Sequence, residues 1–370
     1  MAVRKMSNGR YQATYRGSDG RERQQTFNTK ALAERWEREG RTDAGRGIDI
    51  APVLGKVTCG SWSETWLRAQ AHLAPKTYDR YAGIVTTHIL PRWAERPLAS
   101  ITHAEVQGWV SEMTTQLAPA SVRKTHRVLS LMLDLAVRDG RLARNVAKNM
   151  SLPRVTRAKH RYLSHRQVAE LTEQMDDRDA LIVLVLAYTG LRWGELAALR
   201  VSDVDPLRRR LSVDRSVTEI SGHLIWGLPK DHERRSVPFP AFLAEPLAKQ
   251  CIGRTDSDLL FATTAGTPIR VGNFRRDRFD PAAVRAGLKG LHPHELRHTA
   301  ASLAVSAGAS IKVVQGMLGH RNASMTLDVY ADLFPDDLDE VSEALDAART
   351  KALADFPRTS AQVVSLAKSR

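Results

Sequence analysis

Apolar residues recur at spacings of three and four between Val57 and Asn149, and this pattern constrains the fold more than any other feature of the chain. The spacing places these residues on one face of each of several successive α-helices. Four prolines punctuate the segments as helix starts or breaks: Pro75, Pro91, Pro97 and Pro119. The sequence therefore predicts an all-helical domain of about four helices over residues 56–150.

The first 55 residues have a different pattern. Residues 10–27 alternate between apolar and polar side chains on both sides of Ser18-Asp19-Gly20, which predicts two short strands joined by a turn. Thr29 is a suitable cap for the helical segment ALAERWERE that follows. The glycine-bearing stretch 40–55 then separates this small sheet-and-helix module, residues 1–55, from the helical domain.

The second half predicts a mixed domain. A basic linker, 151–164, ends at Ser164, a suitable cap for a helix over 165–175. A buried apolar helix ending at Thr189-Gly190 follows, and strands near 211–219, 223–227 and 234–239 predict one small antiparallel sheet. The fold class is therefore multidomain and mainly α, with an α+β domain over 165–350 and a tail over 351–370.

The charge indicates a polyanionic partner. The formal net charge is +14 and the pI is near 10.1, and a basic surface attracts phosphates and releases their counterions. Residues 56–158 carry the largest excess, fifteen basic against seven acidic residues. Charge alone does not decide whether this partner is nucleic acid or an anionic membrane.

For a nucleic-acid partner, we predict that the following basic residues contact DNA: Arg10, Arg21, Arg23, Arg123, Lys124, Arg127, Arg154, Arg157 and Lys159.

Two cysteines, Cys59 and Cys251, lie far apart and match no disulfide or metal pattern, which favours a reducing compartment. The first residues lack an apolar signal region, and the longest apolar run, 180–188, is too short to span a bilayer. We therefore expect a soluble, cytoplasmic protein without a membrane partner.

Six residues carry the chemistry. They occur in the segments TGLRWGEL, LPKDHERRSVPFP, HPHELRHTAAS and LGHRNASMTLDVY, and they are Arg192, Lys230, His294, Arg297, His320 and Tyr330. Arginine guanidinium groups can hold the non-bridging oxygens of a phosphate, and histidine and lysine can move protons near neutral pH. A tyrosine hydroxyl, with a pKa of about 10, becomes a nucleophile when a base and cations assist it. The set suits cleavage of a phosphodiester by Tyr330.

Each of these residues also has a plainer interpretation. Arg192 has Glu195 three positions on, which predicts an ion pair. Lys230 lies in a loop between two predicted strands, where a lysine is ordinarily exposed. His294 could be a helix cap and Arg297 a solvated side chain. They are one helical turn apart near Pro293, however, and a shared helix face makes a functional role of the pair more credible than that of either residue alone.

His320 and Tyr330 also have structural interpretations, and a zinc motif competes with the catalytic interpretation of His294. His320 follows a helix end at Leu318-Gly319, whose carbonyls it could satisfy, and Tyr330 fits a half-buried helical position. Residues 294–298 also spell H-E-x-x-H, a zinc-hydrolase motif. The extended form of that motif fails at Ala301 and Ala304, and zinc would leave three of the six residues without a role.

Together the four motifs, in this order, resemble the tyrosine recombinase or phage integrase family. Residues 1–55 resemble the arm-type DNA-binding module of integrases, 56–150 their helical core-binding domain, and 165–350 their catalytic domain. Glu295 stands where the family commonly has aspartate, which is a mild departure.

The resemblance implies a mechanism. Tyr330 would attack a scissile phosphate, giving a 3′-phosphotyrosine and a free 5′ hydroxyl, while Arg192, Arg297 and His320 hold the developing charge. Lys230 would protonate the leaving oxygen and His294 would assist proton transfer at the tyrosine. No cofactor is expected, because the bond energy stays in the covalent ester.

The resemblance also implies partners. Four protomers would assemble on double-stranded DNA attachment sites and exchange strands through a Holliday junction, integrating or excising a phage or mobile element. A host DNA-bending protein and an excisionase are further partners of such systems, and the bound protein would associate with the nucleoid. Two other functions stay open, a type IB topoisomerase-like relaxing enzyme and a non-catalytic DNA-binding protein. Zinc hydrolysis is a further hypothesis, which sensitivity to a chelator would separate from these.

Overall fold

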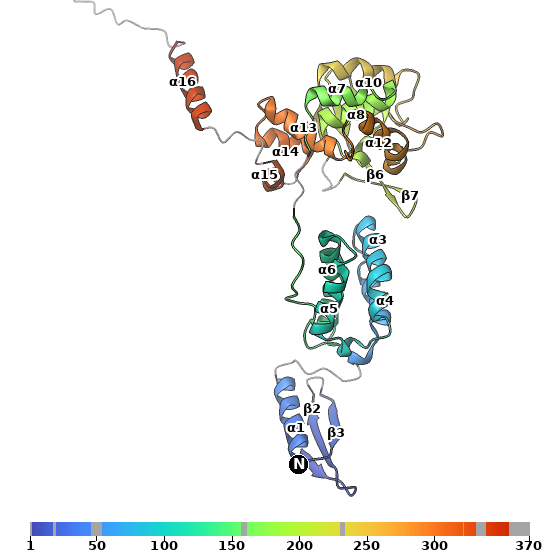
Figure 1. The fold of residues 1–370 in the computed structure, drawn as a ribbon, viewed down its shortest axis with the longest axis vertical. Coiled ribbons are helices and arrows are strands. Elements are labelled where there is room, and N and C mark those ends of the chain that lie inside the picture. Colours follow the sequence, from blue (N-terminus) through green and yellow to red (C-terminus); the bar gives the residue numbers. More distant parts are fainter. Residues whose placement is uncertain are drawn as a thin grey trace, which may run out of the picture. The chain divides into compact units, whose positions relative to one another are not determined.

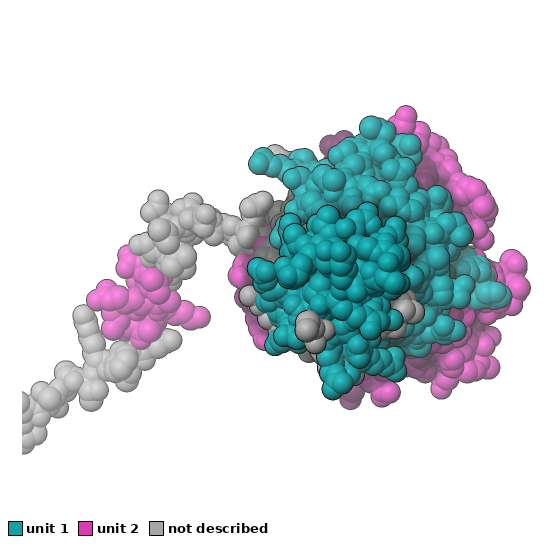
Figure 2. Space-filling view, turned by 90° about the horizontal axis from the view of Figure 1, so that it is seen from below, with its two compact units in different colours: residues 1–159, 219–223 teal, residues 160–218, 224–370 magenta. Residues whose placement is uncertain are grey.

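The computed structural model describes residues 2–17, 20–45, 54–156, 161–229, 234–320, 322–330 and 338–354. The chain divides into two compact units, Met1–Lys159 with Glu219–His223, and His160–Thr218 with Leu224–Arg370, which Figure 2 colours separately. The predicted multidomain and mainly helical architecture is confirmed (Figure 1). No helix among the described residues is both long and apolar enough to cross a membrane.

The N-terminal module is an antiparallel sheet with one helix beside it (Figure 1). Its elements are β1 (Val3–Lys5), β2 (Tyr11–Arg16), β3 (Glu22–Phe27) and α1 (Lys30–Gly45). The two predicted strands are confirmed, with Tyr11 opposite Phe27, and β1 adds a third strand that the sequence analysis missed. Ser18 and Asp19 lie outside the described residues.

Helix α1 begins after Thr29, whose hydroxyl accepts the Leu32 N–H at 3.4 Å. The helix was expected to end before residue 40, and this was wrong, because it continues to Gly45. Gly40 lies against the ring of Tyr15, in the space that a side chain would need. Glycine here therefore lets the helix pack closely on the sheet rather than ending it.

The domain that follows is helical, as predicted, with five α-helices rather than about four among its described residues. Its elements are α2 (Cys59–Ala69), α3 (Pro75–Ile84), a π-helical turn (Val85–Ile89), α4 (Leu90–Trp93), α5 (His103–Thr114) and α6 (Pro119–Arg138). Pro75 and Pro119 stand at the first positions of α3 and α6, where a missing N–H costs nothing. The π turn precedes Pro91, which cannot donate to the carbonyl four residues back. Buried tryptophans, Trp62, Trp66, Trp93 and Trp109, fill the core.

The second unit is built around the buried helix α8. Its helices are α7 (His165–Thr172), α8 (Asp177–Thr189), α9 (Trp193–Leu196), α10 (Ala244–Cys251), α11 (Val271–Phe274), α12 (Asp280–Arg285), α13 (Glu295–Ser306), α14 (Ile311–Leu318), α15 (Ala323–Tyr330) and α16 (Leu338–Ala354). Ser164 caps α7 in a capping box with Gln167, as its position predicted.

The strands of this half form two separate β structures, where the sequence predicted one sheet. Strands β4 (Val204–Asp205), β5 (Arg210–Val213) and β8 (Arg235–Pro238) make an antiparallel sheet in that order. Among the described residues, strands β6 (Ser216–Ile220) and β7 (His223–Gly227) pair with each other alone. Ser221 and Gly222, both with positive φ, form the two-residue turn that lets this hairpin stand alone.

Candidate active site

The end of helix α8 positions the first candidate residue, Arg192. Gly190 adopts the left-handed conformation, with φ of 68°, and its N–H donates to the Leu186 carbonyl. This is the glycine-terminated helix end that the sequence predicted. The chain then turns, and Arg192 becomes the N-cap residue of α9.

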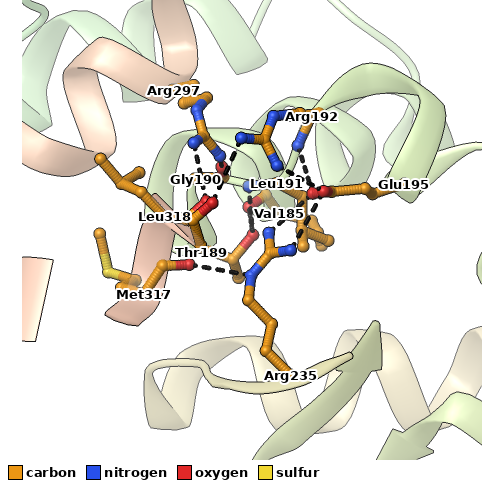
Figure 3. A network of polar contacts seen from close by, with 11 residues as sticks. Val185, Thr189, Gly190, Leu191, Arg192, Glu195, Arg235, Arg297, Met317 and Leu318 are labelled. Carbon is orange, nitrogen blue, oxygen red and sulfur yellow. Dashed lines mark hydrogen bonds and ion pairs between the residues drawn. The ribbon is translucent and has the colours of Figure 1, made fainter. Parts of the chain in front are cut away.

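Glu195 is the centre of a buried ionic network (Figure 3). Its side chain is fully buried, and its two carboxylate oxygens accept three charged hydrogen bonds, from Arg192 Nη1 at 2.9 Å, Arg235 Nη1 at 3.0 Å and Arg235 Nη2 at 2.7 Å. The Arg192 backbone N–H donates to the same group at 2.9 Å. The predicted ion pair between Arg192 and Glu195 is confirmed, but it lies in the interior.

The network also fixes the protonation of Glu195. Burial by itself raises the pKa of the carboxyl group, but the hydrogen bonds and charge of Arg235, followed by those of Arg192, outweigh it and leave the pKa below its usual range. Glu195 is therefore ionised at neutral pH, and its negative charge is paired with both arginines.

The two arginines extend the network to the end of α14. Arg235 Nε donates to the Met317 carbonyl at 3.3 Å, and Arg192 Nη2 donates to the Gly319 carbonyl at 3.3 Å. These carbonyls belong to the last turn and cap of a helix, where no intrahelical N–H is available. The contacts thus join the α8–α9 turn and strand β8 to the segment that precedes His320.

Arg297 joins the same two helix ends from the other side (Figure 3). Its side chain is 3% exposed, with Nη1 donating to the Gly190 carbonyl at 2.5 Å and Nη2 to the Leu318 carbonyl at 2.7 Å. Burial, and then the nearby charge of Arg192, lower the pKa of Arg297 to about 9. Two carbonyl-rich helix C-termini favour a cation between them.

Tyr330 is buried at the end of α15, with 1% of its surface exposed. It packs with apolar residues of α13 and α14, among them Ala301, Val305 and Leu318. Its hydroxyl lies 2.7 Å from Nδ1 of His298. Burial raises the pKa of Tyr330 to about 12, against an opposing effect of the Arg297 charge. The hydroxyl is therefore protonated at neutral pH.

Two more histidines surround this pair. The His320 ring stacks over the Tyr330 ring at 6.4 Å and 10°, and its Nδ1 lies 3.0 Å from the hydroxyl of the buried Thr326. His294 is the exposed N-cap residue of α13, and its ring meets the His298 ring edge-on at 5.3 Å. His294 and Arg297, predicted to share a helix face, thus differ in burial.

Five of the six predicted catalytic residues come together. Arg192, His294, Arg297, His320 and Tyr330 all lie in this site, through the contacts given above. Lys230, predicted to lie in a loop between two strands, is outside the described residues.

The sequence analysis missed two members of the site, Arg235 and His298. Both stood inside quoted motifs, and His298 was noticed only as the second histidine of H-E-x-x-H. A signal for it existed, because His298 follows His294 by four residues and so shares its helix face. The part of the chain that the structure describes contains no group of three or more metal-ligating side chains.

The predicted DNA contacts occupy several places. Arg123, Lys124 and Arg127 are exposed on α6 and line a groove of about 540 Å³ together with Lys148. Arg10, Arg21 and Arg154 are exposed, whereas Arg23 on β3 is 9% exposed. Arg157 and Lys159 lie outside the described residues.

Comparison with protein families decides the relationship. Residues 161–336 match the phage integrase family, 2–46 match the phage integrase N-terminal domain, and 58–114 match the phage integrase N-terminal SAM-like domain. The chain belongs to the phage integrase family of tyrosine recombinases. It is accordingly an enzyme of the tyrosine-type, site-specific recombinase class.

Individual members of the family match over most of their length. The chain is 28% identical over 339 residues to the putative prophage phiRv2 integrase of Mycobacterium tuberculosis (strain CDC 1551 / Oshkosh), covering 88% of this chain and 89% of that protein. It is 26% identical over 386 residues to the integrase of Mycobacterium phage L5, covering 97% and 98%. Its fold is similar to that of lambda integrase in a tetramer bound to a Holliday junction, with a TM-score of 0.58, 20% identity and coverage of 87% and 96%.

Proposed function

We propose that this recombinase cuts DNA by attack of Tyr330 on a scissile phosphate and rejoins it by reversal of that step. The surroundings of the Tyr330 hydroxyl carry the proposal, because they combine a hydrogen-bonded imidazole with the guanidinium of Arg297 and the ring of His320. Attack would form a 3′-phosphotyrosine and release a 5′ hydroxyl. Lys230 would protonate that leaving oxygen.

The arginines would stabilise the transition state. Preorganised donors of this kind are typically worth about 3 kcal/mol each, so loss of one should slow the reaction roughly a hundredfold. Arg297 donates to two backbone carbonyls, and Tyr330 is 1% exposed. Attack therefore requires a rearrangement that makes the hydroxyl accessible to the phosphate.

The biological role would be that of the relatives, integration or excision of a phage or other mobile element. Residues 1–55 would bind arm-type sites, and 56–150, with the exposed cations of α6, would bind the core site. By analogy with lambda integrase, four protomers would act through a Holliday junction. Host bending proteins, an excisionase and a cytoplasmic, nucleoid-associated location belong to the same proposal.

Covalent capture tests the function. The protein is mixed with fragmented DNA of the encoding organism in EDTA, SDS-resistant adducts are isolated, and their attached ends are sequenced. Adducts at one or two sequences, absent with Tyr330→Phe, are expected. Scattered adducts would favour a relaxing enzyme, and DNA binding without adducts would favour a non-catalytic role. A parallel reaction is run without EDTA, and activity that EDTA abolishes would favour a metal-dependent hydrolase.

A further inference from the structure

The nucleophile's hydroxyl has one hydrogen-bond partner whose role the family motif leaves unassigned. Nδ1 of His298 lies 2.7 Å from the Tyr330 hydroxyl oxygen, and the two rings are 5.6 Å apart. His298 is half-buried on α13, and its ring is also in contact with the exposed ring of His294. The imidazole of His298 thus lies between the buried hydroxyl and an exposed histidine.

Among the described residues, three segments bring further charged or titratable groups near the hydroxyl. Arg297 lies on α13 itself, Tyr162 precedes α7, and His320 follows α14. Burial raises the pKa of Tyr330 to about 12; the positive charge of Arg297 opposes this shift and Tyr162 adds to it. The hydroxyl retains its proton at neutral pH, so an attacking oxygen must lose it to a base.

We propose that His298 is a catalytic residue that accepts the Tyr330 proton as the phosphotyrosine bond forms. The Tyr330 oxygen bonds to phosphorus, the bond from phosphorus to the 5′ oxygen breaks, and the hydroxyl proton passes to His298 Nδ1. The leaving oxygen takes a separate proton from the proposed acid, Lys230. Rejoining reverses each transfer, so no oxidant, metal or co-reactant is consumed.

The geometry distinguishes His298 from the histidine that the family motif assigns to proton transfer. His294 is exposed, and its ring meets the ring of His298. The proposed transfer requires the tautomer of His298 with its proton on Nε2 and a free lone pair on Nδ1. This inference rests on the proposed function, because it assumes that Tyr330 is the nucleophile.

The test uses the full-length protein and a DNA fragment recovered by covalent capture, nicked so that the cut strand cannot be rejoined. Single-turnover formation of the adduct is measured across the titration range of histidine for wild type, His298→Asn, His298→Ala and His294→Asn. Asparagine places an amide near the position of Nδ1 but cannot take up a proton. The matched control is His292→Asn, an exposed histidine on the same approach to α13.

We expect the wild-type rate to rise with pH as His298 loses its proton, and His298→Asn to be slower by about a hundredfold without that rise. His292→Asn should behave as wild type, and all variants should bind the fragment equally. The proposal is overturned if His298→Asn keeps the wild-type rate or reacts faster. It is also overturned if the variant is slower with an unchanged pH profile, or if His294→Asn alone removes the rise.

The failure of this proposal and that of the proposed function are separate outcomes. A wild-type protein that forms no adduct, or a Tyr330→Phe variant that forms one, would refute the function itself. Normal adducts that depend on Tyr330 but not on His298 would refute only the assignment of the proton acceptor.

Discussion

Replacing Arg235 by methionine removes the guanidinium that binds both oxygens of Glu195 while keeping an apolar stem of similar length. The variant loses two charged hydrogen bonds to a fully buried carboxylate, at 3.0 and 2.7 Å. Removing one partner of a buried ion pair costs about 3–5 kcal/mol. Because Arg192 and its backbone N–H still bind Glu195, we expect a loss near the lower end, about 3 kcal/mol of unfolding free energy at pH 7.

The dependence on pH provides an internal check. In the wild type the pKa of Glu195 is lowered, so its contribution to stability is present above the unfolded-state pKa and is lost as the pH falls through the folded-state value. Without Arg235, burial becomes the dominant influence and the carboxyl pKa rises. The variant's deficit should therefore be greatest near neutral pH and shrink as the pH falls through the range of an ordinary glutamate, around 4.3.

Hydrogen exchange of the α8 backbone amides, measured by mass spectrometry over a urea series in the full-length protein, reports the stability of this unit. The control is Arg276→Met, since Arg276 pairs with Asp277 at 2.6 Å with its side chain 70% exposed, where a change within about 0.5 kcal/mol is expected. If Arg235→Met costs no more unfolding free energy than this control, or if its deficit is the same at every pH, Arg235 does not stabilise the buried carboxylate of Glu195.

Three further predictions concern Thr326, Arg297 and the cations of α6. Thr326→Val removes, at nearly constant volume, the hydroxyl that lies 3.0 Å from His320 Nδ1 and holds that ring in place. Single-turnover cleavage should therefore slow about tenfold, while DNA affinity, measured by gel shift, is unchanged. An unaffected rate would show that this contact does not position His320. Arg297→Lys keeps a charge but not the planar guanidinium that donates to the Gly190 and Leu318 carbonyls, so adduct formation should fall roughly a hundredfold. A near-normal rate would argue against a role of Arg297 in stabilising the transition state. Replacing Arg123, Lys124 and Arg127 by alanine should reduce the slope of log affinity against log salt by up to about 3, with an unchanged slope excluding the α6 groove from the interface.

Much of the fold follows from local patterns, which is why the sequence predicted it. Helix starts at Pro75, Pro119 and Ser164, and the helix end at Gly190, depend on side chains within one turn of the boundary. Strand β1 was missed because its three residues, Val3–Lys5, are too few to show alternation. The extension of α1 depends on the contact between Gly40 and Tyr15, which a local pattern cannot reveal.

The sequence indicated which residues belong to the site better than it indicated how they are arranged. The order of the motifs indicated the six residues, because each motif contributes a distinct chemical group. The contacts of His298 with Tyr330 and of Arg235 with Glu195 connect positions 32 and 40 residues apart, so they depend on how α15 and β8 pack. The interior location of Arg297 likewise follows from the packing of α13 against α8 and α14, and that of Glu195 from its contacts with Arg192 and Arg235.

Peptide mapping of the covalent adduct identifies the residue that attacks the phosphate, which we propose is Tyr330. The captured adduct is treated with nuclease and protease, and mass spectrometry locates the residue that carries the remaining 3′-phosphonucleotide. We expect this group on Tyr330 and no adduct from Tyr330→Phe. A nucleotide attached to any other residue, or a full yield of adduct from Tyr330→Phe, would show that Tyr330 is not the nucleophile.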